Sequence, residues 1–189
     1  MRDVTPPPEN SKFFRIESLP ACYAYLLHFL RSPIESIKSL PLWSWKDILL
    51  VHFTLAALSG FLGGVFSRNP YTIILGLFIM PIVSLIATSL LSAFIYYFFQ
   101  IFESKTIEFK RIMILAVLAN FPFYLFQIAG EYLPPATLIG FAFCGLLLIV
   151  GLTENFGLAK KKSIRLIGLL FMLVFLVWLW NRIDLAQYK

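Results

Sequence analysis

The chain has 189 residues, of which 59% are hydrophobic and 14% are charged, and its mean hydropathy is +0.82. A water-soluble domain of this length could not bury so much apolar surface, so we expect a membrane bilayer to surround most of the chain. The net charge of +6 does not indicate nucleic-acid binding, because the basic residues lie beside apolar segments and form no single patch. Basic residues in such places favour contact with anionic lipid, at about 1 kcal/mol each.

The N-terminal part of the chain divides into two stretches. Residues 1–12 are polar and interrupted by prolines, so we expect a flexible tail there and no cleavable signal peptide. Residues 13–46 carry apolar side chains at helical spacing and predict cytoplasmic or interfacial amphipathic helices. The apolar stripe of the first of these helices consists of Leu19, Tyr23, Leu26, Leu27 and Leu30.

A second short helix is predicted to begin at Pro33, with Ser32 as its N-cap and Glu35 three residues after the cap. The same capping-box spacing, from Ser44 to Asp47, precedes the first long apolar segment. Amphipathic helices of this kind either lie in the headgroup layer of a membrane or pack beneath a helical bundle as a cap. The sequence leaves both arrangements open.

Five long apolar segments follow, and their lengths suit transmembrane helices. They predict an all-α membrane bundle of five transmembrane helices between residues 47 and 180, with a short outer tail at 181–189. The second segment exceeds the usual span length, and Pro81 predicts a kink in it because proline donates no hydrogen bond to the carbonyl of Leu77. The five predicted spans are 47–66, 71–102, 111–129, 135–152 and 164–180.

Basic residues are concentrated in alternate connecting segments. Thirteen of the sixteen Lys and Arg residues precede the first span or follow the second and fourth spans. The positive-inside rule then predicts a multi-pass protein of the cell (inner) membrane, with its N-terminus in the cytoplasm and its C-terminus outside. The residues that we expect to contact anionic lipid or a partner protein on this cytoplasmic face are Arg31, Lys38, Lys110, Arg111, Lys160, Lys161 and Lys162.

Reactive groups are scarce inside the predicted spans. Acidic, Lys and Arg residues all lie outside the spans or at their ends, and His52 is the one histidine within a span. Metal-ligand spacings such as HxxxH and CxxC are missing, and Cys22 and Cys144 form no disulfide framework. We therefore expect no catalytic residues, no cofactor, no metal site and no enzymatic activity.

Uncharged polar residues remain within the second and third spans. Asn120 lies at the centre of the third span, just before Pro122, and shares a helix face with Gln127. The second span runs in the opposite direction and brings Thr88 to a similar depth, so we predict a hydrogen bond from Asn120 to Thr88 or Ser84, worth about 0.6–2 kcal/mol. This candidate intramembrane polar cluster either stabilises the packing of the spans or binds a substrate. It comprises Ser84, Thr88, Asn120 and Gln127.

Small residues recur every four positions on the first span, at Ala56, Gly60 and Gly64. Such a face allows two helix backbones to approach closely. The partner helix is either another span of the same chain or the same span of a second copy. The sequence therefore leaves open whether the protein forms a homo-oligomer.

Three motifs resemble segments of one known family. Residues 29–37 are similar to a proline-containing amphipathic start, and Phe109-Lys110-Arg111 followed by Ala119-Asn120-Phe121-Pro122 is similar to a third span. The segment from Gly151 to Lys162 is similar to the loop after a fourth span. Over residues 29–180 the chain resembles the Ypt-interacting-protein (Yip) domain family, bacterial type, because the acidic and Tyr-Gly elements of eukaryotic members are not evident. The resemblance implies five spans, a cytoplasmic N-terminus and no catalytic activity.

Two functions agree with these features. The first is a non-enzymatic adaptor or organiser that binds a membrane or cytoplasmic partner protein, or anionic lipid, at its cytoplasmic face. The alternative is a small channel or carrier with a polar path between the second and third spans.

Overall fold

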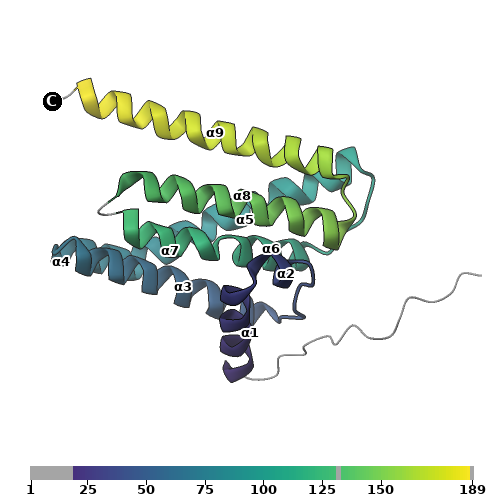
Figure 1. Cartoon of the computed structure of the whole chain (residues 1–189), viewed down its shortest axis with the longest axis horizontal. Coiled ribbons are helices and arrows are strands. Elements are labelled where there is room, and N and C mark those ends of the chain that lie inside the picture. Colours follow the sequence, from purple (N-terminus) through teal and green to yellow (C-terminus); the bar gives the residue numbers. More distant parts are fainter. Residues whose placement is uncertain (1–18, 131–132, 188–189) are drawn as a thin grey trace, which may run out of the picture.

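The computed structural model describes residues 19–130 and 133–187 of the chain. The predicted tail at 1–12, residues 13–18 and the last two residues lie outside these ranges. The long helices lie side by side as a bundle, as Figure 1 shows. In chain order the helical elements are α1 (Leu19–Arg31), α2 (Pro33–Ile37), α3 (Trp45–Phe66), α4 (Pro70–Ile74), the π-helix η1 (Leu75–Ile79), α5 (Met80–Phe102), α6 (Phe109–Ala119), α7 (Phe121–Gly130), α8 (Pro134–Phe156) and α9 (Lys160–Gln187).

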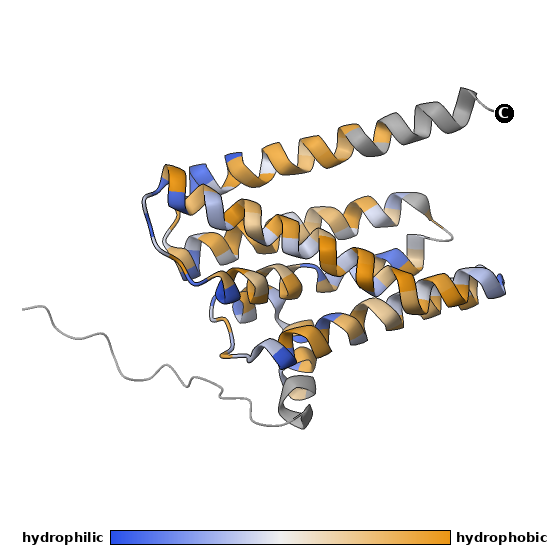
Figure 2. Cartoon of the chain, turned by 180° about the vertical axis from the view of Figure 1, so that it is seen from behind, coloured by the Kyte–Doolittle hydropathy of each residue, from blue (hydrophilic) through white to orange (hydrophobic). Residues whose placement is uncertain are grey.

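Four helical segments are long and apolar enough to cross a membrane. They correspond to the first four predicted spans, with the fourth extending further than predicted. The fifth predicted span lies within α9, and its membrane crossing stays a prediction. Figure 2 shows apolar residues along the long helices and hydrophilic residues gathered at the end where α9 begins. The four segments are Trp45–Phe66, Pro70–Phe102, Phe109–Gly130 and Pro135–Phe156.

The second span contains a π-helical turn beside its proline. Pro81 is the second residue of α5, which follows η1 directly. Proline cannot donate to the carbonyl one turn earlier and its ring crowds that carbonyl, and a wider π-helical turn relieves both constraints. The distortion predicted at Pro81 is therefore present as a π-helical turn within a continuous helical segment.

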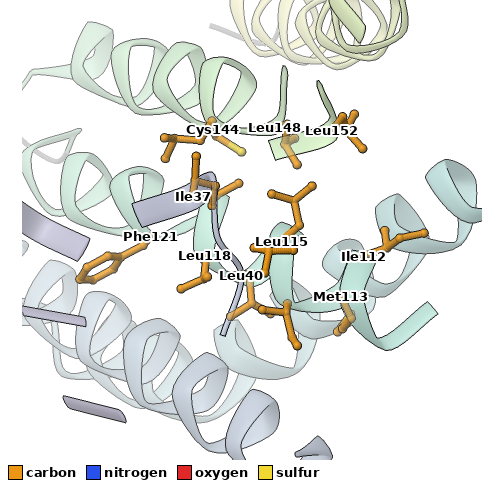
Figure 3. Packing of buried hydrophobic residues seen from close by; sticks show 14 of the residues in the cluster. Ile37, Leu40, Ile112, Met113, Leu115, Leu118, Phe121, Cys144, Leu148 and Leu152 are labelled. Atoms are coloured by element: carbon orange, nitrogen blue, oxygen red, sulfur yellow. The ribbon is translucent and has the colours of Figure 1, made fainter. Parts of the chain in front are cut away.

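The third span is divided at Asn120, where α6 ends and α7 begins one residue later. Its first half is the centre of the fold, because residues 112–119 are all buried. A helix that is apolar on every side is expected in such a position. Figure 3 shows Leu115 and Leu118 of this helix among side chains of the surrounding segments, including Ile37 and Leu148.

The first helix lies across the bundle. In Figures 1 and 2, α1 runs crosswise to the long axis of α3. Among the residues of α1 whose burial is described, 24–31, Leu26 and Phe29 are buried, and the Phe29 ring packs 5.9 Å from the ring of Phe121. Leu27 and Leu30 of the predicted stripe are 64% and 45% exposed, so they do not pack against the bundle.

The segment after α1 packs beneath the bundle as a cap. Ile37, Leu40 and Trp43 are all buried, and α2 contacts both α6 and α8. This packing favours the cap over the headgroup layer, and the position of the segment relative to a membrane stays a prediction. The predicted start of α2 at Pro33 is correct, although the Ser32 side chain makes no capping hydrogen bond.

The capping box before the first span is present in full. Ser44 Oγ accepts a hydrogen bond from the backbone N–H of Asp47 at 3.3 Å, and Asp47 Oδ2 accepts from the backbone N–H of Ser44 at 2.8 Å. These two bonds satisfy donors that the first turn of a helix leaves free. They set the start of α3 at Trp45.

Candidate functional site

A chain of hydrogen bonds crosses the middle of the bundle at Asn120. Asn120 Nδ2 donates to Thr88 Oγ1 of α5 at 3.0 Å, and Cys144 Sγ of α8 donates to Asn120 Oδ1 at 3.1 Å. Ser92 Oγ donates to the backbone carbonyl of Thr88 at 2.8 Å. The predicted bond between Asn120 and Thr88 is therefore present, and Cys144 is a partner that the sequence did not indicate. Asn120 can reach two helices because it lies at the break between α6 and α7.

His52 of α3 forms a second polar group with α5. Its Nε2 lies 3.0 Å from Ser84 Oγ, which donates to the carbonyl of Pro81 at 3.1 Å. Because a serine hydroxyl carries one hydrogen, Nε2 must be the donor in the His52–Ser84 bond. The Tyr124 hydroxyl also interacts with the side chains of Ser84 and Thr88. His52 is fully buried, so its place is inside the bundle and its role is to join α3 to α5.

Gln127 lies apart from the other polar residues. Its Nε2 has a long contact of 3.8 Å with Met80 Sδ, and its Oε1 is buried without a hydrogen-bond partner. Thioether sulfur is a weak acceptor, so the amide of Gln127 is poorly satisfied. Of the four residues in the predicted cluster, Ser84, Thr88 and Asn120 are hydrogen-bonded, and Gln127 lacks a good partner.

All four residues of the predicted cluster line one cavity of about 670 Å³. The cavity is present because α5 stands away from α7, α8 and α9: among the described residues, no Cα atom of α5 lies within 8 Å of a Cα atom in any of those helices. Most of its wall is apolar, with rings such as Phe123 and Phe171. Its size and apolar walls are typical of sites for small molecules.

The cavity offers hydrogen bonds and apolar contact, and it offers no charged group. Among the described residues, none of those that line it is acidic, Lys, Arg or His. Within the described part of the chain, His, Cys, Asp and Glu side chains form no group of three that could hold a metal ion. The side chains that line it are therefore suited to holding an uncharged molecule.

The small residues of α3 face the next helical segment of the same chain. A Cβ atom added at Gly60 would collide with the backbone of Gly76 in η1, and one added at Gly64 would lie 2.6 Å from Ile73 Cα. Ala56 is fully buried one turn earlier. This packing matches the intramolecular interpretation of the small-residue face, since the contacts join two spans within one chain.

The seven basic residues predicted to contact lipid or a partner protein differ in their interactions. Lys38, Lys110 and Lys162 form ion pairs with Glu35, Glu108 and Glu103, at 2.7, 3.2 and 2.6 Å. The hydrogen bond to Glu35 raises the pKa of Lys38 above its ordinary value. Arg31, Lys160 and Lys161 are exposed, whereas Arg111 is half-buried. Of the seven predicted contact residues, three are therefore already held by acidic neighbours.

The loops that follow α5 and α8 are joined by hydrogen bonds. Lys105 Nζ donates to the backbone carbonyl of Gly157 at 3.2 Å and to that of Phe156 at 3.5 Å, where α8 ends. A cation in this position complements the partial negative charge of a helix C-terminus. The Lys162–Glu103 pair joins the same two loops. The sequence placed Lys105 on this face but gave no sign of its partner.

Asn155 attaches the N-terminal cap to the end of α8. Its Nδ2 donates to the backbone carbonyl of Ile37 at 2.8 Å and to that of Gly151 at 3.1 Å. Its Oδ1 accepts from the backbone N–H of Leu40 at 3.3 Å. One side chain thus satisfies backbone groups on both sides of the junction, and sequence reasoning did not identify it.

Comparison with known proteins gives one match. A family model described as the Yip1 domain matches residues 27–181, which include the residues that line the cavity and the loops after α5 and α8. No curated protein and no solved structure matches the chain.

Proposed function

We propose that this protein, which belongs to the Yip1 domain family, is a non-enzymatic membrane adaptor or organiser that works through its cytoplasmic end. The distribution of charge carries the proposal. Among the side chains that the structure describes, Arg68 is the one charged residue at the opposite end of the bundle, since all the others lie near α1, α2 and the loops after α5 and α8. A surface that holds almost all the charge is the surface suited to specific contact with charged partners.

The proposed topology has five spans, a cytoplasmic N-terminus and an outer C-terminus in the cell (inner) membrane. The positive-inside rule supports this orientation. The fifth span is supported by α9, whose 28 residues exceed the number needed to cross a bilayer. Leu169, Met172 and Leu173 of α9 are each more than 60% exposed, as lipid-facing residues would be.

Lys160 and Lys161 are the best candidates for contact with anionic lipid or an acidic partner surface. Both are exposed, and within the described residues neither forms an ion pair with a carboxylate. Lys38, Lys110 and Lys162 are instead engaged with acidic neighbours, so their charges are partly neutralised. The hydrogen bonds from Lys105 to the end of α8 and the ion pair between Lys162 and Glu103 hold the surrounding loops in place.

The test replaces these two charges and measures the lipid that stays with the protein. The Lys160→Gln, Lys161→Gln double variant and an Arg68→Gln control are reconstituted in mixed phosphatidylcholine and phosphatidylglycerol, extracted with their surrounding lipid, and analysed by mass spectrometry. At about 1 kcal/mol for each charge, enrichment of phosphatidylglycerol falls about fivefold per lysine. Arg68→Gln leaves it unchanged. Equal enrichment in the unaltered protein, the double variant and Arg68→Gln, together with no protein partner crosslinked at Lys161 in native membranes, contradicts the proposal.

A small channel or carrier is the second candidate, because Ser84, Thr88, Asn120 and Gln127 line the same cavity. Its test is flux of ions and small solutes from liposomes that contain the protein. Flux that is lost when Asn120 is replaced by leucine favours this candidate. No flux above that of empty liposomes removes it.

A further inference from the structure

We propose that the cavity between α5 and α7–α9 holds a hydrocarbon chain of a phospholipid, which enters from the bilayer leaflet at the end of the bundle where α4 begins and keeps its headgroup outside the cavity. The inference rests on the fifth span proposed above, because α9 forms one side of the cavity. It does not depend on transport or on a partner at the cytoplasmic face.

The cavity is continuous with the surface of the bundle that contacts lipid. Val83 of α5 and Val174 of α9 both line the cavity, and both are exposed at that surface, Val83 by 58%. Val83 lies within a candidate membrane span and Val174 within the proposed fifth span. Among the described residues, no Cα atom of α5 lies within 8 Å of a Cα atom of α9. A hydrocarbon chain of the bilayer can therefore enter the cavity sideways, between these two helices.

The shape of the cavity matches a linear molecule. Along the second span, residues that line it begin at Thr72, recur at every helical turn and end at Leu91. At 1.5 Å per residue, the row is about 28 Å long. It runs along the span and hence across the bilayer, which is the direction of lipid chains. A compact molecule would leave most of this row without contacts, whereas an extended chain can follow it.

The cavity is closed at the end nearer to the charged loops. Directly after Leu91, Ser92 is fully buried, and its Oγ lies 3.4 Å from Met113 Sδ of α6. Ile95, one turn further on, is also fully buried. The helix α5 thus packs against α6 beyond Leu91. The other end of the row is Thr72, in the helix α4 that Figure 1 shows at the opposite end of the bundle. A chain therefore enters at Thr72 and points its terminal carbons toward Leu91.

The wall favours hydrocarbon over water or a headgroup. Most of it consists of rings and aliphatic side chains, whereas each water molecule in such a space needs two to four polar partners. An empty space would deprive the wall of dispersion contacts, which a chain of methylene groups supplies. Among the described lining residues none is charged, so a charged headgroup inside would have no counter-charge, at a high cost. The headgroup is therefore expected to stay outside.

The polar side chains in the middle of the wall bond to one another. Asn120 bonds to Thr88 and Cys144, and Ser84 bonds to His52. These groups already have partners, so an apolar chain can lie against them without leaving them unsatisfied.

The two other polar positions agree with a hydrocarbon occupant. Gln127 Oε1 is buried, so a molecule in the cavity does not reach it. Thr72 lies in the first turn of the second span, at the depth where the ester groups of the entering lipid are expected.

A transmembrane helix of a second copy is too wide for this space. A helix 28 Å long and 10–12 Å across occupies roughly 2,200–3,200 Å³, more than three times the cavity of about 670 Å³. A lipid chain is the thinner of the two apolar occupants that a bilayer offers.

The experiment uses phosphatidylcholine with a photoactivatable diazirine at the terminal carbons of one chain. The full-length protein is reconstituted in nanodiscs of this lipid and irradiated, and the labelled residues are located by mass spectrometry of peptides. Leu148 lines the cavity and is only 4% exposed, so lipid on the outer surface does not reach it. Leu90 is 66% exposed, does not line the cavity and reports surface lipid. We expect labelling of both residues. Labelling of Leu90 without Leu148 would overturn the proposal.

The direction of entry is tested with a second probe, in which the diazirine lies next to the ester group. This probe is expected to label Thr72 and to leave Leu148 unlabelled. The reverse result, with Leu148 labelled by the ester-proximal probe and Thr72 by the terminal one, would contradict entry from the leaflet at α4.

Two variants of α5 test whether the chain occupies the cavity. Ala87→Trp places a ring in the cavity without replacing a bonded polar residue. Overpacking then excludes the chain, and we expect labelling of Leu148 to fall by about tenfold while Leu90 is labelled as before. Ile86→Trp, at an exposed position that does not line the cavity, is the matched control and is expected to leave both signals unchanged. Undiminished labelling of Leu148 in Ala87→Trp would refute the proposal.

Three further results separate the possible failures. If Ala87→Trp does not insert into nanodiscs, which loss of the Leu90 signal would show, the ratio of Leu148 to Leu90 labelling in the unaltered protein decides alone. A dimer in native mass spectrometry that dissociates in Ala87→Trp would show that a second copy fills the cavity, against the proposal. If a tag at the C-terminus lies on the same side of the membrane as Lys161, then α9 does not span, and the premise taken from the proposed function fails first.

Discussion

Two asparagines hold separate parts of this protein together at the scale of single residues. Asn120 joins α5 to α8 at the middle of the bundle, and Asn155 joins the N-terminal cap to the C-terminal end of α8. An amide suits this role because it offers donors and an acceptor on one short side chain.

Replacing Asn155 by alanine should loosen the cap. The substitution leaves the carbonyl of Ile37 and the N–H of Leu40 without their partners, and each unsatisfied buried group costs about 1–3 kcal/mol. We expect limited proteolysis to cut the segment before α3 faster in Asn155→Ala than in Glu154→Ala, an exposed neighbour. Equal cleavage rates in the two variants would show that Asn155 does not hold the cap.

The bond between Asn120 and Thr88 can be measured by a double-mutant cycle. Asn120→Ala, Thr88→Val and the double variant are unfolded from mixed micelles, and the free energies of unfolding are compared. We expect a coupling energy of about 0.6 kcal/mol or more, in the range found for hydrogen bonds between membrane helices. Additive effects of the two substitutions would mean that the bond contributes nothing to stability.

These two residues also show what sequence can predict of the site. The Asn120–Thr88 bond follows from the depth of each residue in antiparallel spans, so it could be predicted. Asn155 bonds to a backbone N–H that lies 115 residues earlier in the chain. No local pattern carries that information, because backbone groups are the same for nearly every residue type. That Gln127 Oε1 has no hydrogen-bond partner was equally unpredictable, since it depends on how far α5 stands from its neighbours.

At the scale of elements, prolines and glycines determine how the spans bend and approach. Pro81 accompanies the π-helical turn of the second span, and Gly60 allows α3 to pack against the backbone of η1. Both effects follow from covalent structure: one residue lacks an N–H and the other lacks a Cβ.

Gly60→Ala should destabilise the bundle, because its Cβ would collide with the backbone of Gly76, which cannot move aside as a side chain could. Overpacking of this kind costs about 1–3 kcal/mol. Gly168→Ala is the matched control, since nothing lies within 4 Å of a Cβ there and alanine favours a helix by up to roughly 1 kcal/mol. We expect thermal stability in detergent to fall for Gly60→Ala and to stay equal or rise for Gly168→Ala. Equal losses in both variants would contradict this packing.

Element positions were predicted well where the signal is local. The capping box at Ser44 and the proline at Pro33 set helix starts that the structure reproduces. The apolar stripe of α1 could be read from the sequence, but which of its residues pack against the bundle could not: Leu26 is buried, whereas Leu27 and Leu30 are exposed. Local chemistry thus determines where helices begin, and packing determines which face of each helix is buried.

At the scale of the whole molecule, the protein combines one charged end with an apolar body. The charged end holds loops that are tied together by Lys105 and by the pair of Lys162 with Glu103. The apolar body contains a cavity beside α5 whose wall is mostly apolar. The two features are separated along the bundle, so a partner at the charged end and a ligand in the cavity can be studied by independent variants.

The central claim is that the charged end faces the cytoplasm, and the position of single cysteines tests it directly. Cysteine is introduced at Lys161 or at Arg68 in a background in which Cys22 and Cys144 are replaced by serine, and intact cells are treated with a membrane-impermeant maleimide. The account predicts labelling of Arg68→Cys from outside and labelling of Lys161→Cys only after the membrane is opened. Labelling of Lys161→Cys in intact cells, with Arg68→Cys protected, would contradict it.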